Sequence, residues 1–99
     1  MVKHLIIWDL KDELSDSEKA EKAKEIKLGL EGLKGQIDGL LDINVQIDFL
    51  DSSNGDMLLD STFEDENALK GYQTNPKHLA VAKIVRANTK SRKCVDFEI

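Results

Sequence analysis

The chain has 99 residues, of which 40% are hydrophobic and 33% are charged, and its formal net charge is −5. This length and balance predict one globular domain over residues 1–99 and argue against a disordered chain. The acidic charge argues against nucleic-acid binding, which needs surplus Lys and Arg to neutralise phosphates.

The first segment expected to form a β-strand covers residues 2–10. Ile6 and Trp8 alternate with Leu5 and Ile7, so the middle of this strand is apolar on both faces and should be covered on both sides. Trp8 is a candidate ligand contact, but its place on an apolar strand face favours the core of a dimer interface.

A capping box running from Ser15 to Glu18 predicts the start of the first helix. Apolar residues then recur at spacings of three and four, which is typical of one buried stripe on a charged helix. The stripe consists of Ala20, Ala23, Ile26, Leu30 and Leu33. Gly35 and Gly39 mark the exit from this helix.

The middle of the chain predicts two strands joined by a hairpin. Residues 41–50 alternate apolar and polar side chains, which indicates a half-buried strand. Ser52 to Gly55 reads as a turn, in which Asn54-Gly55 is a strong hairpin signal. Residues 57–63 form the returning strand.

The last third of the chain predicts two helical pieces and a final strand. Residues 64–72 form the first piece, and Asn75 then caps a second one that has Pro76 at its first position. Residues 93–99 form the last strand, with Val95, Phe97 and Ile99 on one face. The stripe of the second helical piece consists of His78, Val81, Ala82 and Val85.

The resulting order of elements is β-α-β-β-α-β, which predicts an α+β fold of the ferredoxin-like kind. Helices on one side of a four-stranded sheet leave its other face uncovered. An uncovered apolar sheet face on a small chain indicates an interface, and two-fold pairing is the commonest solution. We therefore predict a homodimer that closes its core by packing two sheets together.

Basic residues gather near the C-terminus, namely Lys83, Arg86, Lys90, Arg92 and Lys93. Two interpretations are open. The stretch is either a solvated helix end, where cations complement the helix dipole, or a site for an anion. The charge pattern favours the solvated helix end.

Few residues suggest a metal, a cofactor or a membrane. Cys94 is the only cysteine, which excludes an intrachain disulfide and gives no support for a zinc or redox motif. The acidic run from Glu64 to Glu66 favours a helix N-terminus over a metal site. No phosphate-binding loop, signal peptide or membrane-spanning stretch is recognised. We expect a cytoplasmic protein without a cofactor.

The sequence resembles the stress-responsive dimeric α/β-barrel family, abbreviated Dabb, over nearly its whole length. The matching segments are Val2-Lys3-His4-Leu5-Ile6, Ile37-Asp38-Gly39-Leu40, Phe63 to His78, and Val95-Asp96-Phe97. Asp38 and Asn75 stand where the family often has Pro and His, and the second change removes one titratable group from the site.

The resemblance implies a dimeric α/β barrel with a cavity beneath the helices of each subunit. One relative, olivetolic acid cyclase, closes a polyketide by aldol condensation. His4, Tyr72 and His78 fall where that enzyme has its working His, Tyr and His. The resemblance therefore implies these three residues as the candidate catalytic residues, and together with Trp8 they are the candidate ligand-binding residues.

The chemistry expected of these side chains is proton transfer next to a carbonyl group. His78 follows a helix N-cap, where the helix dipole and burial both keep the imidazole neutral and able to act as a base. Tyr72 brings a hydroxyl donor for an oxyanion, and His4 could orient a carbonyl. Each residue also has a structural interpretation, in which its polar atoms are bonded within the core.

Three functions follow from these alternatives. The leading one is a stress-associated dimeric barrel that binds a small apolar or carbonyl-containing ligand. The second is a cofactor-free enzyme, either a polyketide cyclase or lyase or an oxygenase of the related barrel type, with His78 as the base. The third is a purely structural or assembly module, which requires a filled pocket and internally bonded histidines.

Overall fold

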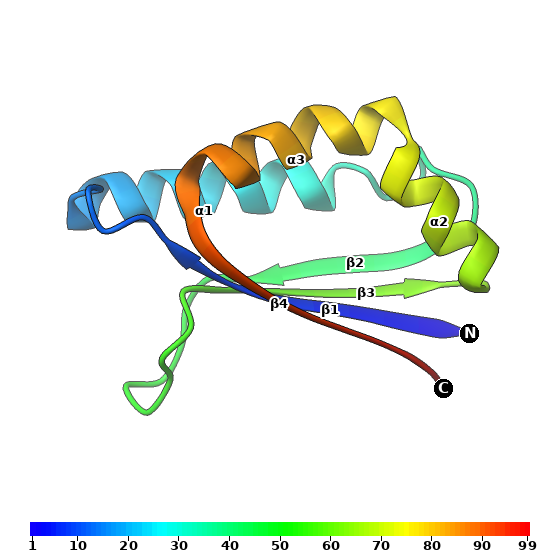
Figure 1. The fold of residues 1–99 in the computed structure, drawn as a ribbon, viewed down its shortest axis with the longest axis horizontal. Coiled ribbons are helices and arrows are strands. Elements are labelled where there is room, and N and C mark those ends of the chain that lie inside the picture. The colour runs from blue at the N-terminus through cyan, green and yellow to red at the C-terminus, as the bar shows by residue number, and fades with distance from the viewer.

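The computed structural model describes residues 1–99 as four strands and three helices in one layer each. The elements are β1 (Val2–Leu10), α1 (Asp16–Glu31), β2 (Leu40–Gln46), β3 (Met57–Phe63), α2 (Glu66–Thr74), α3 (Pro76–Asn88) and β4 (Thr89–Glu98). The strands form an antiparallel sheet in the order β2-β3-β1-β4. Figure 1 shows α1 and α3 along one face of this sheet and α2 at its end. The predicted ferredoxin-like α+β fold is confirmed.

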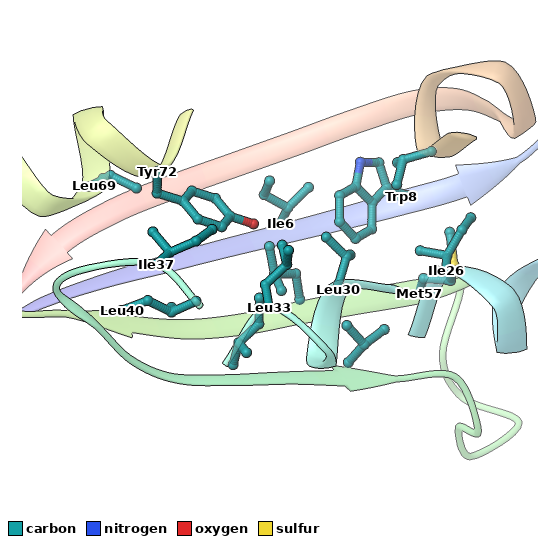
Figure 2. Close-up of a cluster of buried hydrophobic side chains, with 14 of the residues drawn as sticks. Ile6, Trp8, Ile26, Leu30, Leu33, Ile37, Leu40, Met57, Leu69 and Tyr72 are labelled. Carbon is teal, nitrogen blue, oxygen red and sulfur yellow. The ribbon is translucent and has the colours of Figure 1, made fainter. Parts of the chain in front are cut away.

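The hydrophobic core lies between this sheet and the helices. Every even-numbered residue of β1, from Val2 to Leu10, is buried on the helix side. Trp8 belongs to this set and packs among the buried side chains in Figure 2. The prediction that Trp8 fills a dimer interface is therefore wrong. Apolar side chains on both faces of β1 did not reveal which face the helices cover.

The opposite face of the sheet has no helix on it and carries an apolar patch beside the Lys3–Asp60 ion pair. Ile7 is 48% exposed, Val95 54% and Phe97 46%. The strand register pairs Leu5 with Val95 and Ile7 with Leu58, so these side chains form one continuous surface. Figure 1 shows the loop between β2 and β3 projecting on this same side. We call the surface made by Leu5, Ile7, Leu58, Val95 and Phe97 the open face.

The β2–β3 region differs from the predicted hairpin. The strand ends at Gln46 instead of residue 50, and an irregular register near Leu40 buries this side chain and exposes Leu41. The turn forms where the Ser53 amide donates to the Leu50 carbonyl at 2.9 Å. Asn54 and Gly55 lack the positive φ of a type I′ turn, so the tight hairpin signal is not used.

The helical predictions hold with shifted boundaries. The capping box at Ser15 is present. Helix α1 ends at Glu31, so Leu33 is buried just beyond the helix, and Ala20 is exposed. Asp65 caps α2, and Asn75 caps α3 with Pro76 at its start. None of the helices has the length and apolarity needed to cross a membrane.

Two glycines after α1 give a test of how closely α2 packs on the preceding loop. Gly35 and Gly39 both have φ near +80°. A Cβ added at Gly35 would meet nothing within 4 Å, whereas a Cβ added at Gly39 would overlap Ala68. We expect Gly35→Ala to cost about 1–2 kcal/mol through backbone strain alone. Gly39→Ala should cost about 1–3 kcal/mol more, because Ala68 has to move. Urea unfolding of the two variants measures this difference, and equal losses would contradict the close packing.

Candidate functional site

A cavity of about 510 Å³ lies on the helix side of β1 and β4, beneath α2 and α3. It forms because α1 packs on β2 and α3 packs mainly on α1 and α2, while β4 stays largely exposed. All four predicted site residues line it. They are His4 and Trp8 from β1, Tyr72 from α2 and His78 from α3.

The break between α2 and α3 brings Tyr72 and His78 together. Tyr72 lies in the last turn of α2 and His78 in the first turn of α3. Asn75 ends one helix and caps the next by accepting from the Lys77 amide at 2.9 Å. The two rings consequently stack with centroids 4.1 Å apart and planes tilted by 35°. The His4 ring lies edge-on to Tyr72, with a centroid distance of 6.3 Å.

Two buried polar atoms at this cavity have no hydrogen-bond partner, the Tyr72 hydroxyl and His78 Nδ1. The Tyr72 side chain is almost fully buried, and burial raises the pKa of its phenol. Figure 2 shows its hydroxyl directed toward Ile6 on β1. An unpaired buried polar group costs about 1–3 kcal/mol. This arrangement is therefore unfavourable by itself, and a ligand whose polar groups reached these two atoms would relieve it.

The environment of His78 favours its neutral form. Burial is the largest cause that lowers the pKa of His78, and the backbone carbonyl of Gln73 acts in the opposite direction. The charges of His4, Arg86 and Arg92 lower this pKa further. A neutral imidazole at pH 7 agrees with the prediction and leaves a lone pair that can accept a proton.

The lowered pKa of His78 gives a prediction for stability. Folded His78 binds its proton more weakly than the unfolded chain does, so the unfolded state takes up more protons as the pH falls. The contribution of His78 is thus complete above its ordinary pKa of 6.5 and is lost as the pH drops below it. Urea unfolding at about pH 7.5 and about pH 5.5 should show a larger loss for wild type than for His78→Gln. Equal losses would mean that His78 protonates normally in the folded protein.

A residue that sequence reasoning missed, Asp96, holds His4 in place. His4 is buried, and its Nδ1 is hydrogen-bonded to the Asp96 carboxylate on the neighbouring strand. If Nδ1–H is the donor, Nε2 is left as a proton acceptor. The signal lay in the register of β1 and β4, which pairs His4 with Asp96. The sequence placed Val95 and Phe97 on one face but did not reveal what Asp96 would meet.

The same corner contains the residues that could hold a metal ion. Ligand atoms of His4, Cys94 and Asp96 lie within 4.8 Å of one another. The Cys94 sulfur is 3.7 Å from His4 Nδ1 and 3.6 Å from the Asp96 carboxylate. Burial raises the pKa of the Cys94 thiol, which opposes the thiolate that a metal requires. His4 and Asp96 are already hydrogen-bonded to each other, so a metal ion would first have to separate them.

All five residues of the basic stretch near the C-terminus are exposed, and three of them also line the cavity. Arg86, Lys90 and Arg92 line the cavity, whereas Lys83 and Lys93 do not. Arg86 is exposed in the last turn of α3, which agrees with the interpretation as a solvated helix end. That interpretation is wrong for Lys90 and Arg92, which belong to strand β4. Strand β4 begins at Thr89 and not at Lys93, which brings Lys90 and Arg92 back toward the helices.

The comparison with protein families is decisive. The family model of the stress-responsive A/B barrel domain, Dabb, matches residues 2–99. The chain belongs to the Dabb family. None of the curated proteins is similar enough to be matched with this Dabb chain.

Solved structures share the fold of this Dabb chain. A dimeric protein of unknown function and ferredoxin-like fold from Bacteroides fragilis has 31% identity and a TM-score of 0.92, over 99% of this chain and 95% of that chain. A dimeric ferredoxin-like protein of unknown function from Thermobifida fusca has 20% identity and a TM-score of 0.84, over 99% and 90%. The hydroxynitrile lyase from Passiflora edulis has 16% identity and a TM-score of 0.80, over 99% and 92%. At these identities, the last two establish only the shared fold.

Proposed function

We propose that this Dabb protein binds a small, largely apolar compound with a carbonyl group in the cavity beneath α2 and α3. The observation that carries the proposal is the pair of buried, unpartnered polar atoms at the cavity, the Tyr72 hydroxyl and His78 Nδ1. A carbonyl oxygen accepts hydrogen bonds and would pair with the Tyr72 hydroxyl. Ile6, Trp8 and Leu59 supply apolar contacts for the remainder of such a ligand.

A purely structural role fits the site less well. That role requires a filled pocket and histidines that are bonded internally. His4 does meet this requirement, since Asp96 holds it. His78 meets it in part through a hydrogen bond with the Gln73 carbonyl, whereas the open cavity and the unpaired Tyr72 hydroxyl do not meet it.

Tyr72→Phe separates ligand binding from structural stabilisation. Removing an unpaired buried hydroxyl should stabilise the free protein by roughly 1 kcal/mol, because its desolvation cost disappears. The same change should weaken binding of a methyl ketone about fivefold to tenfold, because one hydrogen bond to the carbonyl is lost. Urea unfolding without ligand and calorimetric titration with the ketone measure the two effects. A variant that is less stable and binds equally well would assign the hydroxyl to the core.

We also propose that two copies pair through the open face as a homodimer. The support is the exposed apolar surface around Ile7, Val95 and Phe97, which is unusual for a chain that stays single. The Bacteroides fragilis and Thermobifida fusca proteins, which share the fold, are described as dimeric. The cavity lies on the other side of the sheet, so pairing would leave it accessible.

A second candidate function is proton abstraction next to the ligand carbonyl. The observation that favours it is the neutral His78 stacked on Tyr72, which places a base beside a hydroxyl donor. The hydrogen-bonded pair of His4 and Asp96 offers another base at the same cavity. The Passiflora edulis enzyme with this fold is described as a lyase, so the fold accommodates an enzyme.

A further inference from the structure

The charged residues that line the cavity are basic, whereas the chain as a whole has an acidic net charge. The chain has 19 acidic residues against 14 Lys and Arg. The 15 residues that line the cavity include three permanent cations and neither Asp nor Glu. Acidic groups stand behind three of the lining residues: Asp96 is hydrogen-bonded to His4, Asp9 to Ser91 and Asp12 to Lys90. The side chains that line the cavity therefore carry a net positive charge, whereas the chain as a whole is acidic.

Two of the three cations are free to act on a ligand. Lys90 is paired with Asp12 at 2.7 Å. Neither Arg86 nor Arg92 has an ion pair. Both guanidinium groups lie close enough to His78 for their charge to lower its pKa. They come from different elements, α3 and β4, and both exposed residues line the same cavity.

The helix dipole explains only part of this arrangement. Arg86 is in the last turn of α3, where a cation complements the helix end. That account does not extend to Arg92, which lies within β4 at the position paired with Trp8. It also gives no reason for the lack of acidic side chains on the cavity wall. A ligand with a negative charge accounts for all three features.

We propose that the ligand of this site carries a carboxylate, which Arg86 and Arg92 bind while its carbonyl group reaches Tyr72 and His78. Guanidinium groups match carboxylates through paired hydrogen bonds, and an apolar wall beside them suits an aliphatic or aromatic linker. The substrate class is thus an oxo acid and not a neutral ketone. This inference rests on the proposed function, because it assumes that the carbonyl group binds in the same cavity.

The test compares acids with their neutral esters. We would titrate the protein calorimetrically, at low ionic strength, with 4-oxopentanoate, 6-oxoheptanoate and 8-oxononanoate and with the methyl ester of each. The series varies the distance between carbonyl and carboxylate. The best acid should bind on the order of tenfold more tightly than its ester, because only the acid pairs with the arginines. Added salt should reduce this preference.

Two matched double variants test whether Arg86 and Arg92 are the cations that bind the carboxylate. Arg86→Gln combined with Arg92→Gln should abolish the preference for the acid, so that each acid and its ester bind this variant equally well. Lys77→Gln combined with Lys83→Gln removes the same charge from exposed positions of α3 outside the cavity and should retain the preference. Equal binding of acids and esters, or a preference that survives the arginine changes, would overturn the carboxylate and leave cavity binding intact. Failure of acids and esters alike to bind would instead overturn the proposed function and this inference with it.

Discussion

Replacing Ile7 with Asp is expected to convert the homodimer into a monomer. Ile7 lies on the central strand β1, is 48% exposed in the single chain and pairs with Leu58 and Lys93 on the open face. A two-fold interface would bury two new carboxylates at once, and each costs several kcal/mol without a partner. The dissociation constant should rise on the order of a thousandfold or more. Sedimentation equilibrium over a range of concentrations measures it.

Leu28→Asp is the matched control for this prediction. Leu28 is 68% exposed on α1, on the helix side of the molecule. The same change of side chain there should leave the dimer unaffected. A dimer that survives Ile7→Asp would place the interface elsewhere, and a wild-type chain that is monomeric at low micromolar concentration would contradict pairing altogether.

The largest expected effect on chemistry comes from His78→Gln. If His78 removes the proton next to a bound carbonyl, the protein should catalyse exchange of these protons for deuterium in 6-oxoheptanoate dissolved in heavy water. Loss of the base should slow this exchange by about 10²–10⁴-fold. Proton NMR of the ketone measures the rate without knowledge of the natural substrate. Because the pKa of His78 is lowered, the wild-type rate should be independent of pH above about 6.5.

Asp96→Asn distinguishes the two possible bases. This change weakens the hydrogen bond between residue 96 and His4 and leaves His78 intact. It should therefore slow deuterium exchange much less than His78→Gln does. A larger loss in Asp96→Asn would assign the base to His4. A wild-type rate equal to the background rate would exclude proton abstraction for this ketone and leave a binding protein.

The fold could be read from the sequence because its local signals agree with its packing. The capping box at Ser15 and the Asn75-Pro76 helix start are decided by hydrogen bonds within a few residues of the chain. Such signals do not depend on distant partners. The prediction of a tight β2–β3 turn was wrong. Asn54-Gly55 only favours the positive φ values of a tight hairpin, and the longer loop that forms does not need them.

The candidate site was predicted only in part. The register of the strands, and the side of the sheet to which each side chain points, depend on how distant strands pair. The resemblance to the Dabb family supplied His4, Tyr72 and His78, and the structure gathers all three at one cavity. Asp96 and Arg92 act from β4, whose start and pairing the sequence did not reveal. The side on which Trp8 lies was likewise hidden, since both faces of β1 are apolar.

The central claim is that a carbonyl compound occupies the cavity against Tyr72 and His78. The chain has one tyrosine and two histidines, so their ring protons are readily distinguished by NMR. We would add unlabelled 6-oxoheptanoate to isotope-labelled protein and record filtered nuclear Overhauser effects from the ligand methyl group. The account predicts saturable contacts from this methyl group to the rings of Tyr72 and His78. Saturable binding without these contacts, or with contacts to the open face instead, would contradict it.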